Sequence, residues 1–475
     1  MIYLLLPLGL LLPTLSGRFV IKLLEQNHPV LQGMERWVLS VVFGITMMMF
    51  FSFIAELLGL VPFNLTGLLG VQIVSTLGLW MVWMRCKLHW SSPVPAPVIA
   101  PSRTPTRWMK VIVLLLCLWT IAKIIGGFVT LTGTPIYEDD AFKNWNMRGK
   151  QFFLTQELTL ENELEDVLQG SGGISSYPIT VPLTKTWLAT LAGEWHEGLA
   201  NSIHIVWFIA ALLLVFFTLR RKMSVWWALF GAYALSSLPL YFLHGTTAYV
   251  DVFLSVHVFA VLSLLLGALQ CSDSKQRLSF LRLSALAAGL LVFTKNEALI
   301  MHLPVLIILI LMSLRFLYKS EKIGHREAHS ALLHYLILIG LILVPWVLFK
   351  WAHNLNFGNA KSVLDLNLSW QEGVAKAIAV NTFLEGNWIL LFPLLIGILF
   401  IRRKEAFQFP NIILSAFVLL IVLGQFPLYF FTGISTEALN QTGYARGLVQ
   451  IAPVAITLLM LLVHSWLSPA MNEQE

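Results

Sequence analysis

The segment WMKVIVLLLCLWTIAKIIGGFVTLTGTPIYEDDAFKNWNMRGK, residues 108–150, combines two features that decide the fold. Residues 108–131 form an apolar run long enough to cross a bilayer, because a spanning helix needs about 20 predominantly apolar residues. Directly after this run come three consecutive acids, Glu138, Asp139 and Asp140. Carboxylates at a membrane edge are costly to desolvate, and they therefore indicate a functional site.

The composition extends this interpretation to the whole chain. Of its 475 residues, 57% are hydrophobic and 12% are charged, and the mean hydropathy is +0.77. A water-soluble chain of this length could not cover so much apolar surface with polar residues. A membrane β-barrel would instead show alternating segments of about 10 residues. We therefore predict an all-α, polytopic membrane protein.

The apolar runs predict about thirteen transmembrane helices. They cover residues 1–16, 37–60, 65–84, 108–131, 200–219, 225–242, 250–269, 278–293, 299–316, 332–348, 388–401, 412–431 and 448–466. No positive charge precedes the first run, so we expect a retained helix with the N-terminus outside and, after thirteen spans, the C-terminus in the cytoplasm.

The distribution of Lys and Arg supports this orientation. It places 21 of these residues in inner loops and 9 in outer loops, with Lys123 inside a span. Cytoplasmic loops carry the excess of positive charge, so the acidic segment faces outward. The overall pI near 9.2 then reflects membrane topology, and we expect no nucleic-acid partner.

Three regions follow from the order of the spans. Residues 1–90 hold three leading transmembrane helices, residues 91–107 form a Pro-rich cytoplasmic linker, and residues 108–475 form the main transmembrane module. Within that module, residues 133–197 form a long outer loop. Its leucines between residues 154 and 168, and the segment from Pro182 to Leu191, are typical of helices lying at the membrane interface.

Several charged residues at outer span ends are candidates for chemistry. If the acidic segment is extended, Glu138 and Asp140 share a face; one acid could act as a base while the other binds a sugar hydroxyl or a divalent metal. The alternative is a solvated turn in which Asp139 or Asp140 caps the next helix. Lys295 and Arg446 are candidates for binding a phosphate, with a snorkelling lysine and an interface anchor as the alternatives.

These motifs together resemble the GT-C superfamily of polytopic glycosyltransferases, in particular the bacterial protein O-mannosyltransferase and aminoarabinose-transferase group. The resemblance rests on IYEDDAFKNW, SYPITVPL followed by WLATLAGEWHEGLANS, HGTTAYVDVFLS and AGLLVFTKNEALIMHLPV, which occur in the family's order within residues 109–310. Two departures are the three helices before the acidic loop and the adjacency of Asp139 and Asp140, which puts a metal in doubt.

The resemblance implies a membrane glycosyltransferase that moves a monosaccharide from a polyprenyl-phosphate carrier to a lipid, glycan or protein acceptor outside a bacterial inner membrane. Asp139 or Asp140 would be the catalytic acid of the family, and Lys295 with Arg446 would bind the donor phosphate. No cofactor is certain, and a divalent metal would use Glu138 and Asp140. The residues expected to bind substrate or support the site are Glu138, Lys143, Trp145, Arg148, Tyr177, His244, Asp251 and Glu297.

Two rival functions share this topology. A transporter or flippase of lipid-linked glycans would usually show internal repeats and charges at the membrane midplane, whereas the charges here gather at one membrane edge. A polysaccharide polymerase or ligase that uses diphosphate-linked glycans would be expected to carry its large functional loop later in the chain.

Overall fold

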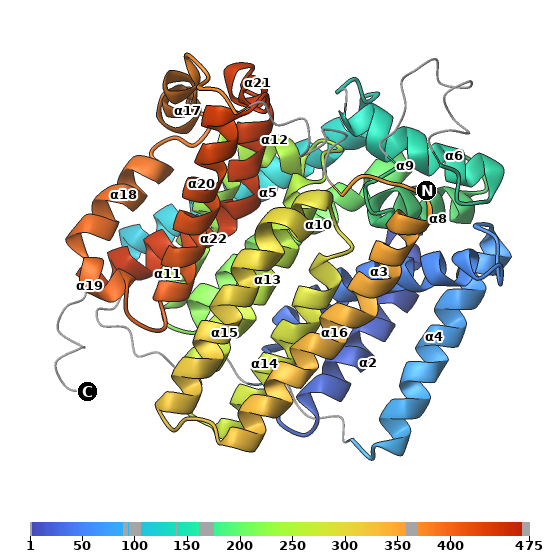
Figure 1. Cartoon of the computed structure of the whole chain (residues 1–475), viewed down its shortest axis with the longest axis horizontal. Coiled ribbons are helices and arrows are strands. Elements are labelled where there is room, and N and C mark those ends of the chain that lie inside the picture. The colour runs from blue at the N-terminus through green and yellow to red at the C-terminus, as the bar shows by residue number, and fades with distance from the viewer. Residues whose placement is uncertain are drawn as a thin grey trace.

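The computed structural model describes residues 2–88, 94, 106–138, 140–160, 175–357 and 368–467, and every regular element in these ranges is helical. The chain is therefore all-α, as predicted (Figure 1). The helices are η1 (Ile2–Leu4), α1 (Leu5–Gly9), α2 (Leu11–Glu25), α3 (Gly33–Leu57), α4 (Leu65–Arg85), α5 (Arg107–Gly133), η2 (Ala141–Met147), α6 (Arg148–Thr155), α8 (Thr180–Ala192), α9 (Glu197–Asn201), α10 (Ile203–Arg220), α11 (Val225–Ser236), α12 (Pro239–Gly245), α13 (Asp251–Gln270), α14 (Ser274–Leu291), η3 (Ala298–His302), α15 (Leu303–Lys319), α16 (His325–Ala352), α17 (Val374–Phe383), α18 (Leu391–Ile401), α19 (Arg403–Ala406), α20 (Ile412–Phe431), α21 (Ser435–Leu439) and α22 (Gly443–Leu467).

Within the described ranges, 10 helices are long and apolar enough to cross a membrane, or 11 if the pair α11 and α12, bent by 79°, forms one broken span. The predicted count of thirteen is therefore not confirmed. Two predicted spans account for the difference. Helix α14 carries Arg277 and Arg282 and is too polar, although it runs beside α13, and α18 has only 11 residues.

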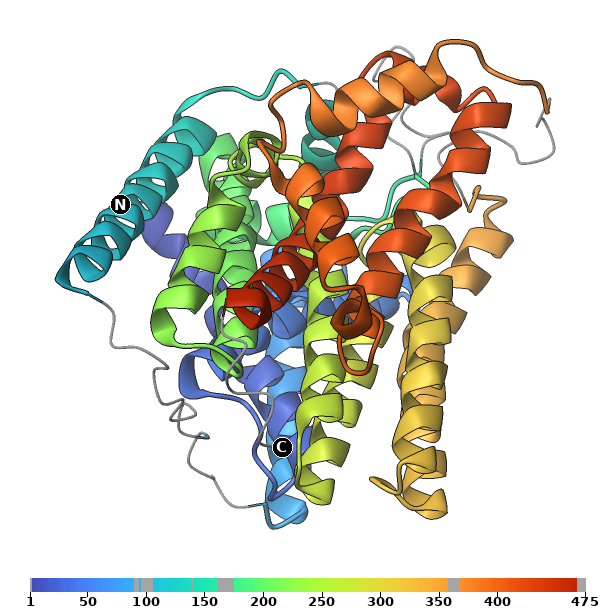
Figure 2. The ribbon, with the colours of Figure 1, turned by 90° about the vertical axis from the view of Figure 1, so that its left-hand side faces the viewer.

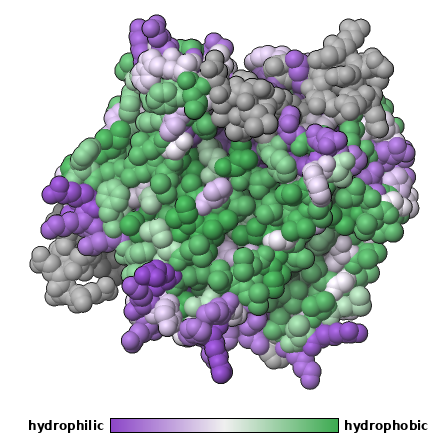
Figure 3. Space-filling view, in the orientation of Figure 1, coloured by the Kyte–Doolittle hydropathy of each residue, from purple (hydrophilic) through white to green (hydrophobic). Residues whose placement is uncertain are grey.

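The surface of the molecule supports a multi-pass membrane protein. A broad hydrophobic belt crosses its middle, and hydrophilic residues gather at the upper and lower ends (Figure 3). Helix α5 contributes strongly to this apolar surface, since Leu114, Leu118 and Ile125 are each more than half exposed. Side chains of this kind are stable at a surface only where lipid replaces water.

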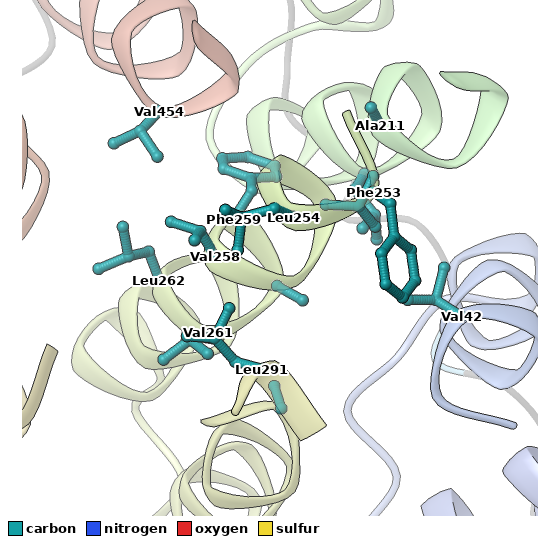
Figure 4. Packing of buried hydrophobic residues seen from close by; sticks show 14 of the residues in the cluster. Val42, Ala211, Phe253, Leu254, Val258, Phe259, Val261, Leu262, Leu291 and Val454 are labelled. Carbon is teal, nitrogen blue, oxygen red and sulfur yellow. The ribbon is translucent and has the colours of Figure 1, made fainter. Parts of the chain in front are cut away.

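Helix α13 is the centre of the packed core. Every residue from Asp251 to Leu269 is buried. Figure 4 shows its side chains meeting two of its neighbours: Phe253 points toward Val42 of α3, and Val261 lies near Leu291 of α14. A helix that is apolar on all faces must be enclosed by protein or lipid, and here protein encloses it.

Small residues let the leading helices approach one another closely. A Cβ atom at Gly17 of α2 would lie 2.0 Å from the carbonyl oxygen of Ser40 in α3, and one at Gly44 of α3 would lie 1.9 Å from that of Pro13. Small residues at such crossings are typical of membrane helix pairs, whose association relies on close packing. The leading helices thus pack tightly as a pair.

One end of the bundle collects the helix ends on which the predicted site residues lie. Helices α5, α14 and α16 end there, while α13 and α22 begin there, in the upper part of Figure 1. The N-terminal turn is at the same end, because the Tyr3 hydroxyl donates to the Thr132 carbonyl oxygen at 3.3 Å. The fold therefore brings distant parts of the sequence to one membrane edge.

The predicted loop helices have different outcomes. The segment from Pro182 to Leu191 is indeed helical, within α8, but protein encloses it and residues 180–189 are all buried. Most of the other predicted helix, residues 154–168, lies outside the described residues, as does most of the Pro-rich linker. Placement of either helix at a membrane interface remains a prediction.

Candidate active site

The site is built around the carboxylate of Asp251, at the first turn of α13, which is fully buried. Its Oδ1 accepts hydrogen bonds from Lys295 Nζ and Gln450 Nε2, both at 2.8 Å. Its Oδ2 accepts from Arg446 Nε at 3.2 Å and lies 3.3 Å from His244 Nδ1. A buried carboxylate with this many partners is both compensated in charge and fixed in position.

Arg446 extends the cluster toward the acidic segment. Its Nη1 contacts Asp140 Oδ2 while its Nε holds Asp251, so that one guanidinium joins two carboxylates from distant parts of the chain. The side chain of Asp140 is 34% exposed, whereas that of Asp251 is fully buried. Asp140 is therefore a carboxylate of the cluster that a substrate can reach.

An aromatic layer supports the guanidinium. The Tyr249 ring lies 5.1 Å below Arg446 and stacks on His244 with 4.5 Å between ring centroids. Burial raises the pKa of Tyr249 above its ordinary value, with Arg446 acting in the opposite direction. A neutral tyrosine ring over which a cation lies suits a cation–π contact.

The cation Lys295 is held between two acids. Besides Asp251, its Nζ contacts Glu297 Oε1 at 2.9 Å. Burial alone would lower the pKa of Lys295, but the two carboxylates outweigh it and raise the pKa above its ordinary value. Lys295 is thus a fixed ammonium.

A second lysine next to this one has no carboxylate partner. Lys350, at the end of α16, donates to Asn296 Oδ1 at 2.8 Å and to the Asn356 carbonyl oxygen at 2.9 Å. Among the residues that the structure describes, no acid lies within ion-pair distance of it. Asn296 follows Lys295 directly, so the two lysines flank one amide, and the hydrogen-bond partners of Lys350 among the described residues are both neutral.

The segment that carries Asp140 is held at both of its ends. Glu197 Oε1 accepts from the Ile136 backbone N–H at 2.9 Å and from Asn146 Nδ2 at 3.4 Å. Fully buried Lys185 donates to Asn146 and, at 2.9 Å, to Asn201. The functional segment is therefore fixed to α8 and α9 and does not form a free loop.

Lys185 provides a first test of this attachment. Replacing Lys185 by Met would leave two buried amide oxygens without a donor, which costs roughly 1–3 kcal/mol. We expect a lower unfolding temperature by tryptophan fluorescence, together with reduced activity. Lys150→Met, an exposed change on α6, is the matched control and should leave both unchanged. An unaltered Lys185→Met protein would show that the network does not hold the segment.

Tyr177 joins the segment to the cluster. Its carbonyl oxygen accepts from Arg148 Nη1 at 3.1 Å, and its ring lies 5.2 Å from that of Trp145. Burial, and next the negative charge of Glu297, raise the pKa of the Tyr177 hydroxyl well above its ordinary value. The hydroxyl is therefore a neutral hydrogen-bonding group near the carboxylates.

Most predicted site residues thus come together: Asp140, Trp145, Arg148, Tyr177, His244, Asp251, Lys295, Glu297 and Arg446. Lys143 lies half-buried in η2, and Asp139 lies outside the described residues. The expectation that Glu138 and Asp140 share a face of an extended segment is wrong, because Asp140 has helical backbone angles (φ −64°, ψ −38°) and leads into the π-helix η2. Asp140 also makes no side-chain capping bond to that helix.

The structure also shows a residue that the sequence did not select. Lys350 sits at the end of an apolar span beside Trp351, where a lysine is typical of the membrane interface. Its contact with Asn296 joins residues 54 positions apart, which spacing alone could not indicate.

The divalent metal considered from the sequence finds no ligand set in the described part of the chain, where no group of three or more His, Cys, Asp or Glu residues could hold an ion.

Comparisons with known proteins show which proteins this chain is similar to. Residues 176–349 match the family model "Dolichyl-phosphate-mannose-protein mannosyltransferase". Two solved structures of ArnT from Cupriavidus metallidurans, one apo and one bound to undecaprenyl phosphate, have the same helical arrangement, with TM-scores of 0.51 and 0.52 and 14% sequence identity. The chain has the fold of ArnT. A comparison with curated protein sequences finds no match.

The matches cover only part of the chain, and they include some residues of the site but not others. The ArnT comparisons cover 76% and 75% of this chain, and the chain spans only 62% and 60% of the ArnT chains. The family match includes Tyr177, Asp251 and Lys295, whereas Asp140 and Arg446 lie outside it. The part of the cluster inside the family match is therefore completed by two residues that only the three-dimensional structure connects to it.

Proposed function

We propose that this protein is a glycosyltransferase that moves a monosaccharide from a polyprenyl-phosphate donor to an acceptor at the outer face of the cell's inner membrane. The observation that carries the proposal is the contact of Arg446 with both Asp140 and Asp251, which places an accessible carboxylate beside buried cations. The donor class is supported by the dolichyl phosphate in the matched family's name and by the undecaprenyl phosphate bound to ArnT.

The chemistry follows from the charges. Asp140 accepts the proton of an acceptor hydroxyl, whose oxygen attacks the anomeric carbon of the donor sugar. The bond between that carbon and the phosphate oxygen breaks, and polyprenyl phosphate leaves with the bonding electrons. Because a phosphate is a stable anion, no acid needs to protonate it, in contrast to glycoside hydrolysis. The remaining requirement is positive charge at the phosphate.

Lys350 and Lys295 best meet that requirement. Lys350 hydrogen-bonds to neutral groups and to no described carboxylate, so its ammonium group is available to a phosphate, and Lys295 lies one residue from the shared Asn296. Arg446 already contacts two carboxylates, so we assign it to orienting Asp140 and not to the phosphate. This assignment changes the sequence-based prediction for Arg446 and adds Lys350.

The phosphate site can be tested at Lys350. A hydrogen bond to a charged group contributes roughly 1.5–3 kcal/mol, so Lys350→Met should raise the KM for the donor by about 10- to 100-fold. Lys319→Met is the control, because Lys319 is the last residue of α15 and lies at the end of that helix far from the site. This change should leave the KM for the donor unchanged. A normal donor KM in Lys350→Met would place the phosphate elsewhere.

The function itself is tested with a panel of donors. Purified protein in lipid nanodiscs is given an acceptor-containing membrane extract and a polyprenyl-monophosphate sugar, a polyprenyl-diphosphate sugar or a nucleotide sugar. We expect turnover with the monophosphate alone and release of polyprenyl phosphate. Preference for the diphosphate would favour a polymerase or ligase, and preference for the nucleotide sugar would contradict an outward-facing site.

A further inference from the structure

A cavity of about 370 Å³ lies between α5 and α12, next to the site. We call it the α5–α12 cavity; it is lined by residues between Lys123 and Glu138 on one side and between Phe242 and Ala248 on the other. We propose that this cavity binds the acceptor and that the acceptor is a membrane lipid with a hydroxyl-bearing head group. The inference rests on the proposed function.

The depth of the cavity favours a lipid. Its lining extends from Lys123 to the end of α5, and the rise of about 1.5 Å per residue places Lys123 about 16 Å below Thr134. That distance is about half the hydrocarbon thickness of a bilayer. A protein or soluble glycan approaching from outside would need a groove on the outer surface, whereas a lipid needs space that continues into the membrane.

The lining changes along the cavity in the way an amphipathic molecule requires. Leu131, Phe242 and Leu243 provide apolar walls, and Thr134, Tyr137 and Glu138 provide a polar mouth. The surrounding helix faces lipid, since only 11% of the apolar window of α5 is buried. A lipid in the adjacent leaflet can therefore enter sideways while its head group stays at the outer edge.

Lys123 holds the inner end of the cavity in place. Its Nζ donates to the Ser236 carbonyl oxygen at 2.8 Å and to the hydroxyls of Ser236 at 3.0 Å and Ser237 at 3.1 Å. These residues form the break between α11 and α12, where the two helices bend by 79°. The bend opens space against α5, and the lysine satisfies a carbonyl oxygen that the broken helix leaves without its helical partner.

The mouth of the cavity leads to Asp140 along two chain segments. Glu138 lines the mouth, and its carbonyl oxygen accepts from the Phe142 backbone N–H at 2.8 Å, so the chain turns directly into the segment of Asp140. On the other wall, Ala248 precedes Tyr249, whose ring underlies Arg446. A hydroxyl at the mouth would therefore meet the carboxylate that accepts its proton.

The donor chain is a competing occupant, and the arrangement of the helices argues against it. Lys350 and Lys295 lie at the ends of α16 and α14, while the cavity is bounded by α5 and α12. Figure 2 shows α5, in cyan, and α16, in orange-yellow, on opposite sides of the molecule. Donor and acceptor thus approach Asp140 from different sides, as direct transfer between two lipids requires.

Gly126 allows a direct test. It lines the cavity, and a Cβ atom added to it would meet no atom within 4 Å, so Gly126→Phe fills the space without a backbone clash. Ile125→Phe, on the lipid-facing side of the same turn, is the matched control. The assay follows label from a polyprenyl-phosphate sugar into lipids extracted from an envelope membrane preparation, with release of polyprenyl phosphate measured in parallel.

We expect wild type to place the label in extracted lipid. Gly126→Phe should lower the rate of this transfer at least tenfold with an unchanged donor KM, and Ile125→Phe should have normal activity. If Gly126→Phe misfolds, Gly126→Cys modified with a bulky thiol reagent replaces it. Wild type treated with the same reagent is the control, because it shows the effect of modifying the native cysteines Cys86, Cys117 and Cys271. Three results would overturn the inference but not the proposed function. They are label in protein or water-soluble glycan, equal effects of the two Phe variants, and a raised donor KM in Gly126→Phe. Absence of polyprenyl phosphate release by the wild type would instead overturn the proposed function and the inference with it.

Discussion

Replacing Asp140 by Asn is expected to lower the rate of sugar transfer by about 10²- to 10⁴-fold, which is the usual contribution of a general base. The side chain keeps its size and can still accept a hydrogen bond from Arg446, so the loss should fall on kcat while the donor KM stays within about threefold. Steady-state kinetics in nanodiscs with a labelled polyprenyl-phosphate sugar measure both quantities.

Two neighbouring acids serve as controls for this result. Asp139→Asn and Glu138→Gln change the same acidic run, in which Asp140 is the residue that contacts Arg446 among those that the structure describes. We expect both controls to retain activity within about tenfold of the wild type. A large loss in Asp139→Asn together with full activity in Asp140→Asn would move the base to Asp139.

Replacing Asp251 by Asn should have the largest effect on stability. The change removes the negative charge that Lys295 and Arg446 share, and breaking a buried ion pair on one side costs roughly 3–5 kcal/mol. The Asn amide group would also present N–H donors to groups that now donate to Asp251. We expect a clearly lower unfolding midpoint in detergent, monitored by tryptophan fluorescence, and loss of transfer.

Ser255, one turn further along α13, provides the matched control. It is also buried, and its hydroxyl lies 3.0 Å from the Tyr241 hydroxyl, so Ser255→Ala removes one neutral hydrogen bond and should cost roughly 1–3 kcal/mol, less than the loss at Asp251. The double variant Asp251→Asn with Arg446→Met removes one of the unpaired cations and should recover part of the stability. If Asp251→Asn unfolds like Ser255→Ala, the carboxylate is not the centre of the cluster.

The fold class was largely predictable because it depends on hydropathy and helix length. The likeness to the ArnT fold was also predictable, since the motifs that suggested it lie in local stretches such as HGTTAYVD and FTKNEA. The number of transmembrane spans was harder to predict. The apolar run at residues 278–293 looks like a span in the sequence, but helix α14 begins at Ser274 and carries arginines in a buried position beside α13.

The sequence indicated many residues that the structure brings together, but it did not indicate their arrangement. Asp140 and Arg446 are 306 positions apart, and no local spacing links them. Lys350 looks like an interface lysine until its partners, Asn296 and Asn356, are known. The helical backbone at Asp140 likewise depends on attachments made by Glu197 and Lys185 from later in the chain.

Whether the bond between sugar and phosphate breaks in a single turnover distinguishes a glycosyltransferase from a transporter. Protein in sealed proteoliposomes is given less than one equivalent of a polyprenyl-phosphate sugar in the presence of envelope lipids, and the extracted products are identified by mass spectrometry. We predict that wild type cleaves this bond, releasing polyprenyl phosphate and attaching the sugar to an acceptor, while Asp140→Asn leaves the donor intact. A donor that crosses the bilayer with the bond uncleaved would identify a transporter and contradict the account.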